Sequence, residues 1–199
     1  MQTFTRVYDD YAQAAEAVRK LERIGIPADD ISVVANKSVT DNYADTTNVD
    51  DPSEAAAGAG IGAAVGGGAG LLAGLGMLAI PGLGPVVAVG WLASTALGVV
   101  AGSAAGGLIG ALVDAGTSKE DAHVYSEAVR RGGTLVTVRT NHTSDQIEAT
   151  LDGYKPINPI GRRAEYEKSG WTEFDPDAPP YRDEEVTTEQ QRIKRSRTG

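Results

Sequence analysis

Residues 55–113 read AAAGAGIGAAVGGGAGLLAGLGMLAIPGLGPVVAVGWLASTALGVVAGSAAGGLIGALV. This block of 59 residues contains no charged side chain, and it holds 17 of the 25 glycines in the chain. The flanking segments are polar and acidic, and the chain has a formal net charge of −9. The composition therefore predicts a polar domain split into residues 1–54 and 114–154, an apolar insert over 55–113, and a charged, proline-containing tail over 155–199.

Glycine recurs at every fourth position along both halves of the insert. Glycine costs about 1 kcal/mol relative to alanine inside a helix, so this repeat needs a compensating role. Small residues spaced by four form a flat helix face against which a second helix packs closely. The sequence therefore predicts an antiparallel glycine-zipper hairpin, with helices over 56–80 and 86–113 joined by the turn Ile80-Pro-Gly-Leu-Gly-Pro85. The predicted helix-packing residues are Gly58, Gly62, Gly66, Gly70, Gly74, Gly98, Gly102, Gly106 and Gly110.

Either predicted arm is long enough to span a bilayer. The arms have 25 and 28 residues, whereas about 20 apolar residues cross the hydrocarbon region. We therefore expect two transmembrane helices in the inner membrane, with both termini in the cytoplasm because the uncharged tip crosses more easily than the polar domain. The first half of the insert is mostly alanine and glycine, which partition weakly into lipid. The alternative is a cytoplasmic protein whose apolar block is buried in a homo-oligomer or against a partner.

The polar segments carry alternating strand and helix signals. Helix caps at Asp10, Ser118 and Thr143 each precede apolar residues at helical spacing. Three β-rich stretches predict strands over residues 3–8, 31–35 and 134–140. The order strand–helix–strand, insert, helix–strand–helix is typical of a small α/β sandwich. We expect a ferredoxin-like arrangement that lacks one strand and has its helices on one face of the sheet.

The tail combines acids, prolines and three aromatic residues. Trp171, Phe174 and Tyr181 lie in a segment with too few apolar side chains to form a core alone. We expect this tail to be disordered, although its aromatic residues could dock onto a partner or onto the parent domain. A basic cluster over 192–197 is either solvated or a contact for anionic lipid headgroups.

No pattern in the chain predicts catalysis or a cofactor. The absence of cysteine excludes thiolate metal sites and cysteine nucleophiles, and the two histidines, His123 and His142, are expected at the surface and in a turn. The acidic net charge argues against nucleic acid as a partner. Gly58-Ala-Gly-Ile-Gly-Ala63 matches a dinucleotide fingerprint, but no predicted strand precedes it and the glycine repeat explains it. We therefore expect no enzymatic activity, no metal or other cofactor, and no small-molecule substrate.

Several stretches resemble a known family. Arg6-Val-Tyr-Asp-Asp-Tyr-Ala-Gln-Ala-Ala-Glu-Ala-Val18 and Gly25-Ile-Pro-Ala-Asp-Asp-Ile-Ser-Val-Val-Ala35 resemble the start of the bacterial YflT-type general stress protein domain, the heat-induced stress protein family. The glycine-rich insert and Glu127-Ala-Val-Arg-Arg-Gly-Gly-Thr-Leu-Val-Thr-Val138 are also similar to that family. The resemblance covers about residues 3–140. It implies a bacterial stress-response protein with no established enzymatic activity and no defined catalytic residues.

These observations lead to two hypotheses of function. The first is a non-enzymatic bacterial general stress-response protein, associated with the membrane through a glycine-zipper hairpin that packs against further copies. The alternative is a soluble, oligomeric protein-binding module in which the hairpin is buried by a second copy or by a partner protein.

Overall fold

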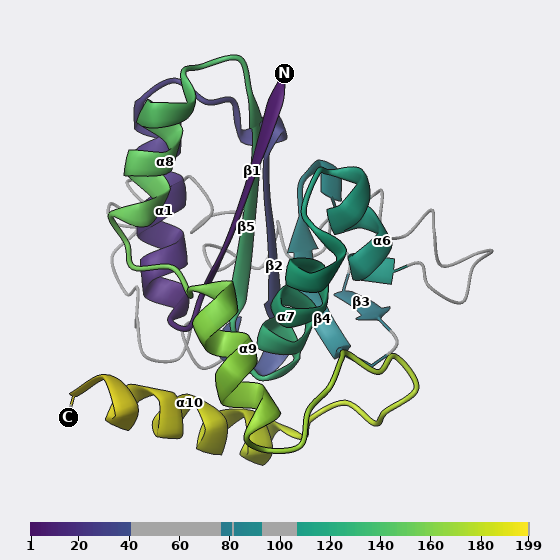
Figure 1. The fold of residues 1–199 in the computed structure, drawn as a ribbon. Coiled ribbons are helices and arrows are strands. Elements are labelled where there is room, and N and C mark those ends of the chain that lie inside the picture. The colour runs from purple at the N-terminus through teal and green to yellow at the C-terminus, as the bar shows by residue number, and fades with distance from the viewer. Residues whose placement is uncertain (41–76, 81, 93–106, 199) are drawn as a thin grey trace, which may run out of the picture.

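The computed structural model describes residues 1–40, 77–80, 82–92 and 107–198, which form a mixed α/β fold (Figure 1). The elements in chain order are β1 (Gln2–Tyr8), α1 (Tyr11–Arg23), the short 3₁₀-helix η1 (Ala28–Asp30), β2 (Ile31–Asn36), β3 (Met77–Ile80), β4 (Gly84–Val89), α6 (Gly107–Asp114), α7 (Lys119–Arg130), β5 (Thr134–Thr140), α8 (Ser144–Asp152), α9 (Pro159–Glu167) and α10 (Asp183–Thr198).

Local signals explain where the helices of the polar domain begin and end. The side chain of Asp10 accepts a hydrogen bond from the Ala12 N–H at 2.9 Å and caps α1. Ser118 caps α7 in the same way, accepting from the Asp121 N–H at 3.1 Å. Gly25 ends the first helix region with φ +96°, a conformation that glycine adopts without steric cost. The predicted helices after Asp10 and Ser118 are therefore confirmed.

The strands form one antiparallel sheet in the order β1-β5-β2-β4-β3. β5 lies between β1 and β2, pairing Val7 with Leu135 on one side and Val33 with Val136 on the other. β1 and β2 are therefore parallel to each other, and α1 makes the connection between them. The three strands predicted over residues 3–8, 31–35 and 134–140 are confirmed.

Helices cover both faces of this sheet. Alternate residues of a strand point to opposite faces, and Val136 of β5 belongs to the hydrophobic cluster of α1 and α8, whereas Leu135 belongs to that of α6 and α7. Figure 1 shows α1 and α8 on one side of the strands and α6, α7 and α9 on the other. The expectation of helices on a single face is therefore wrong. Strands β2 and β5 are buried along nearly their whole length because both of their faces are covered.

The prediction of two long helices over 56–80 and 86–113 is wrong at residues 77–80 and 84–89, whereas 107–113 are helical as predicted and the other residues lie largely outside the described ranges. Residues 77–80 and 84–89 are the strands β3 and β4, which pair with each other, and β4 also pairs with β2. The turn between them is tight, because the Leu83 N–H donates to the Ile80 carbonyl at 3.0 Å and Gly82 and Gly84 adopt φ +74° and +78°. β-Branched residues in β4 then favour the extended strand.

The transmembrane prediction also needs correction. Among the helices that the structure describes, none combines the length and the hydropathy needed to cross a bilayer. In the predicted second arm the structure describes α6, whose Leu108, Ala111 and Leu112 side chains pack in the core.

The tail, expected to be disordered, forms two helices that return to the domain. α9 carries buried Arg162 and Tyr166, and α10 carries buried Val186 and Ile193. Between them Phe174 enters the core. The alternative that the aromatic residues of the tail dock onto the parent domain is thus confirmed for Phe174. The tail is too polar to form a core of its own, and it is ordered here because its few apolar side chains share the core of the sheet.

Candidate functional site

Residues 168–182 connect α9 to α10, and we call residues 171–182 the strap. Figure 1 shows the strap, in yellow-green, passing from the end of α9 beside the ends of β3 and β4 and on to α10. The strap contacts a surface that we call the strap site, formed by Gly82, Leu83, Gly84, His123, Arg130 and Arg131. The strap and the strap site are far apart in sequence and meet only through the fold.

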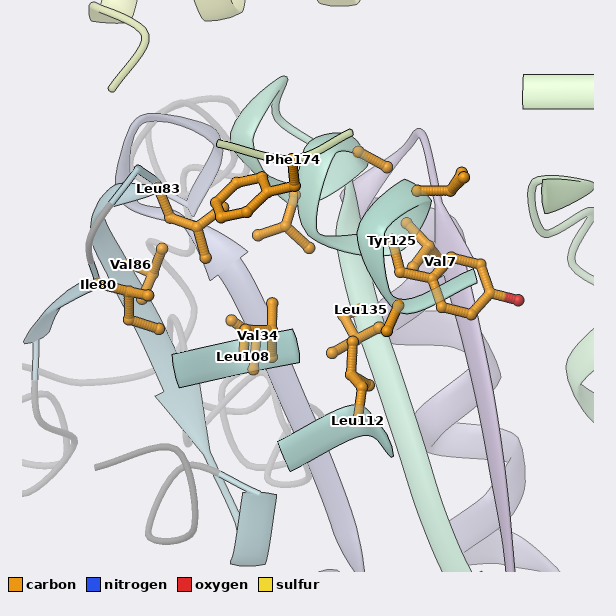
Figure 2. Packing of buried hydrophobic residues seen from close by; sticks show 14 of the residues in the cluster. Val7, Val34, Ile80, Leu83, Val86, Leu108, Leu112, Tyr125, Leu135 and Phe174 are labelled. Atoms are coloured by element: carbon orange, nitrogen blue, oxygen red, sulfur yellow. The ribbon is translucent and has the colours of Figure 1, made fainter. Parts of the chain in front are cut away.

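Phe174 anchors the strap in the hydrophobic core. Its side chain is 6% exposed and belongs to the cluster that includes Leu83 and Val86. Figure 2 shows its ring beside Leu83, at the end of β4. The Phe174 N–H donates to Nδ1 of His123 at 3.3 Å, so the backbone is held as well as the ring. Burying one such side chain contributes about 1.5–3 kcal/mol relative to leaving it exposed.

Two glycines of the β3–β4 turn allow the strap to approach closely. A methyl group placed on Gly82 would lie 2.7 Å from the carbonyl oxygen of Asp175, and one placed on Gly84 would lie 2.7 Å from Cβ of Pro180. Both the carbon–oxygen and the carbon–carbon distance are too short for non-bonded atoms, and both glycines also have positive φ. These two positions therefore need glycine for the turn and again for the contact with the strap.

Two arginines at the end of α7 hold the second half of the strap. The Arg130 guanidinium lies 5.0 Å from the ring centre of Tyr181 and donates to the Pro179 carbonyl at 2.9 Å. The Arg131 guanidinium lies 5.7 Å from the same ring and 4.3 Å from that of Tyr166. A cation over an aromatic face contributes about 0.5–2 kcal/mol, depending on how far it is desolvated. Cation–π contacts and a hydrogen bond from the arginines therefore hold the strap, in addition to the buried Phe174 ring.

A buried carboxylate positions these arginines. Glu127 is only 1% exposed, and its oxygens lie 2.6 Å from Arg131 and 3.4 Å from Arg130. Burial alone would lower the pKa of the Arg131 guanidinium, but attraction to Glu127 outweighs it and the pKa is raised. A buried carboxylate is tolerated only when it is paired, so Glu127 fixes both guanidinium groups where they meet the strap.

α10 extends the attachment beyond the strap. Val186 is fully buried, and the Gln190 side chain donates to the Gly132 carbonyl at 2.8 Å. Glu189 pairs with Arg131 at 3.3 Å and with Arg192 at 2.8 Å. The same arginine that touches Tyr181 therefore also binds α10.

The attachment of α10 should weaken in acid. The hydrogen bond from Arg192, followed by attraction to Arg192 and Arg131, holds the pKa of Glu189 below its ordinary value, and burial opposes this only in part. A carboxylate with a depressed folded pKa stabilises the docked state above its ordinary pKa of about 4.3 and loses that contribution as pH falls through the folded value.

We expect amide exchange of residues 186–193, corrected for the intrinsic rate, to accelerate as the pH falls below the ordinary carboxyl pKa of about 4.3, because α10 detaches. In Glu189→Gln this acid-dependent step should shrink, since the titrating group is gone. An unchanged pH profile in the Gln variant would assign the step to other carboxylates.

α9 places the start of the strap. Arg162, buried on α9, pairs with Asp9 at 2.5 Å. Tyr166 is almost fully buried, which raises the pKa of its hydroxyl. Its ring meets that of Trp171 edge-to-face, with centres 5.5 Å apart. The first strap residue is therefore fixed to α9, which is itself fixed to the residue following β1.

The acidic residues of this cluster join separate chain segments. Glu127, Glu189 and Asp9 each pair with at least one guanidinium. Within the described ranges, no group of three or more histidine, aspartate or glutamate side chains is placed to bind a metal ion.

The structure places few of the predicted site residues. Of the nine predicted helix-packing glycines, Gly110 lies in α6, where it is half-buried. The others lie outside the described residues, so their packing role stays a prediction: Gly58, Gly62, Gly66, Gly70, Gly74, Gly98, Gly102 and Gly106. His123, expected at the surface, instead accepts from the strap. The three aromatic residues of the tail were the available signal for this site.

No protein-family model, no curated protein and no solved structure matches this chain. The resemblance of residues 3–140 to the YflT-type general stress protein family therefore remains an expectation drawn from the residues that carry it.

Proposed function

We propose that this chain is a non-enzymatic protein-binding module whose strap site holds an extended polypeptide segment. The observation that carries the proposal is the burial of Phe174 between the β3–β4 turn and α7, with its backbone bonded to His123. A surface that holds one such segment within the chain has the shape and polarity to hold another of the same kind.

The contacts define the class of segment that fits. An aromatic anchor must enter the core, and acidic residues and prolines must follow it, as Asp175 and the pair Pro179-Pro180 do in the strap. A second aromatic ring then meets Arg130 and Arg131. The cationic end of α7 favours ligands that carry negative charge, which adds to association rate and to specificity.

The resemblance to general stress proteins indicates the cellular process in which such binding would occur. It favours a bacterial stress response in the cytoplasm, with homo-oligomers or a protein partner as the binding event. This follows the alternative hypothesis of a protein-binding module, because the described parts of the insert contribute strands and a short helix to the core.

A labelled peptide spanning residues 171–193 tests the proposal. The receptor is the full chain carrying Phe174→Ala, in which the tethered competitor is weakened. We expect saturable binding by fluorescence anisotropy, and binding at least about tenfold weaker to the wild-type chain, because a tethered segment competes at millimolar effective concentration. The matched control is the same peptide with alanine in place of its Phe174. Equal binding of both peptides, or no binding to the variant chain, would overturn the proposed function.

A further inference from the structure

We infer that the partner of the strap site is a second copy of this chain, and that two chains exchange residues 174–198, which comprise most of the strap together with α10, and so form a dimer. This inference rests on the proposed function and names its ligand.

The strap has a defined hinge. α9 is closed at its end by hydrogen bonds from the Gly170 N–H to Glu167 at 3.0 Å and from the Trp171 N–H to Tyr166 at 3.2 Å. Thr172 and Glu173 follow and are exposed, and the next residue is the buried Phe174. Two exposed residues therefore separate a segment fixed to α9 from a segment fixed to the strap site, so rotation at this hinge redirects the second segment while α9 keeps its contacts.

Exchange preserves the contacts that hold the strap and α10. Phe174 with Leu83, Tyr181 with Arg130, and Glu189 with Arg131 all join residues after the hinge to residues before it. Each of these contacts can be made equally well by a second copy, because the sequences are identical. Forming an exchanged dimer therefore costs the entropy lost on association and the free energy of changing the hinge conformation. None of these interactions is lost.

Two effects oppose the dimer. A short tether gives the chain's own strap a millimolar effective concentration, and a net charge of −9 on each copy makes the chains repel each other. Raising the protein concentration overcomes the first effect, and added salt screens the second. The dimer should therefore gain population with concentration and with moderate ionic strength.

Complementation between two full-length variants tests this inference. Gly82→Ala blocks the strap site but leaves an intact strap, because the added methyl group meets Asp175. Phe174→Ala weakens the strap but leaves an open site. We expect each variant alone to be monomeric by native mass spectrometry and an equimolar mixture to give a 1:1 heterodimer, since the strap of the first fits the site of the second.

Gly25→Ala is the matched control for Gly82→Ala. Gly25 has φ +96° and no atom within 4 Å of the added methyl group, so it reproduces the backbone strain without touching the strap. Mixed with Phe174→Ala, it should give little heterodimer because its own strap stays docked. If circular dichroism shows that Gly82→Ala does not fold, Gly84→Ala blocks the contact with Pro180 instead.

The two proposals fail separately. If the labelled peptide binds Phe174→Ala and no heterodimer forms in the mixture, the exchange is wrong and the strap site serves another protein. If neither the peptide nor the second chain binds, both proposals are overturned. A heterodimer that forms equally with the Gly25→Ala control would also overturn the exchange, because it would not depend on a displaced strap.

Discussion

Replacing Phe174 by alanine should release the strap from the body of the fold. Removing a buried phenylalanine side chain costs about 3–5 kcal/mol, through lost burial and the cavity that remains. The global free energy of unfolding should fall by less than this, because the loss is limited to the free energy with which residues 171–193 dock. Once they have detached, the sheet and its other helices lose nothing further.

Amide exchange and limited proteolysis check this prediction. Exchange of strap amides, including the N–H that donates to His123, should accelerate by two or more orders of magnitude, since each 1.4 kcal/mol is a factor of about ten. New cleavage sites should be confined to the strap. Ile160→Ala is the control, because its side chain is 78% exposed and its removal should cost no more than about 0.5 kcal/mol. Equal protection of the strap in both variants would contradict the anchoring role of Phe174.

The elements that the sequence predicts correctly are those with signals at both ends. α1 and α7 each have a capping side chain, an apolar face and a glycine soon after the helix, and β1, β2 and β5 are short β-rich stretches between polar turns. Such signals act over a few residues, so they can be read from one segment. Which face of the sheet each helix covers depends on strand order, which local signals do not contain.

β3 and β4 show why the helix prediction fails over residues 77–80 and 84–89. A run of apolar and small residues suits a buried strand as well as a helix, and the glycine repeat at every fourth position favours the helix. The turn over 80–85 contains two glycines and two prolines, which suit a hairpin of either kind. The pairing of Val34 with Ala88 makes residues 84–89 a strand and not a helix, and these two residues are distant in sequence.

The sequence predicts the segment that docks but not the surface onto which it docks. The aromatic residues of the tail were visible, and docking onto the parent domain was one of the predicted alternatives. The strap site itself cannot be predicted from the sequence, because Leu83, His123 and Arg131 come from separate segments that the fold brings together. The prediction of a disordered tail considers only the apolar residues within the tail itself. Phe174 and Val186 are nevertheless buried, because side chains from other segments cover them.

The buried ion pair between Arg162 and Asp9 should contribute strongly to the free energy of unfolding. Burial alone would lower the pKa of the Arg162 guanidinium, but attraction to Asp9 and a hydrogen bond to it raise that pKa, so the guanidinium keeps its charge in the buried site. Removing one partner of a buried pair leaves a charge without compensation, which costs about 3–5 kcal/mol. We expect Arg162→Met to lower the free energy of unfolding by that amount in urea titrations.

Arg163→Met is the matched control, because Arg163 is the neighbouring residue on α9 and pairs with no acid among the described residues. It should change stability by no more than about 0.5 kcal/mol. The double variant Asp9→Asn with Arg162→Met should be less destabilised than the sum of the two single variants, since neither charge is then stranded. Strictly additive losses would mean that the two groups do not interact. Because α9 fixes Trp171 through Tyr166, Arg162→Met should also raise amide exchange in the strap, and Arg163→Met should not.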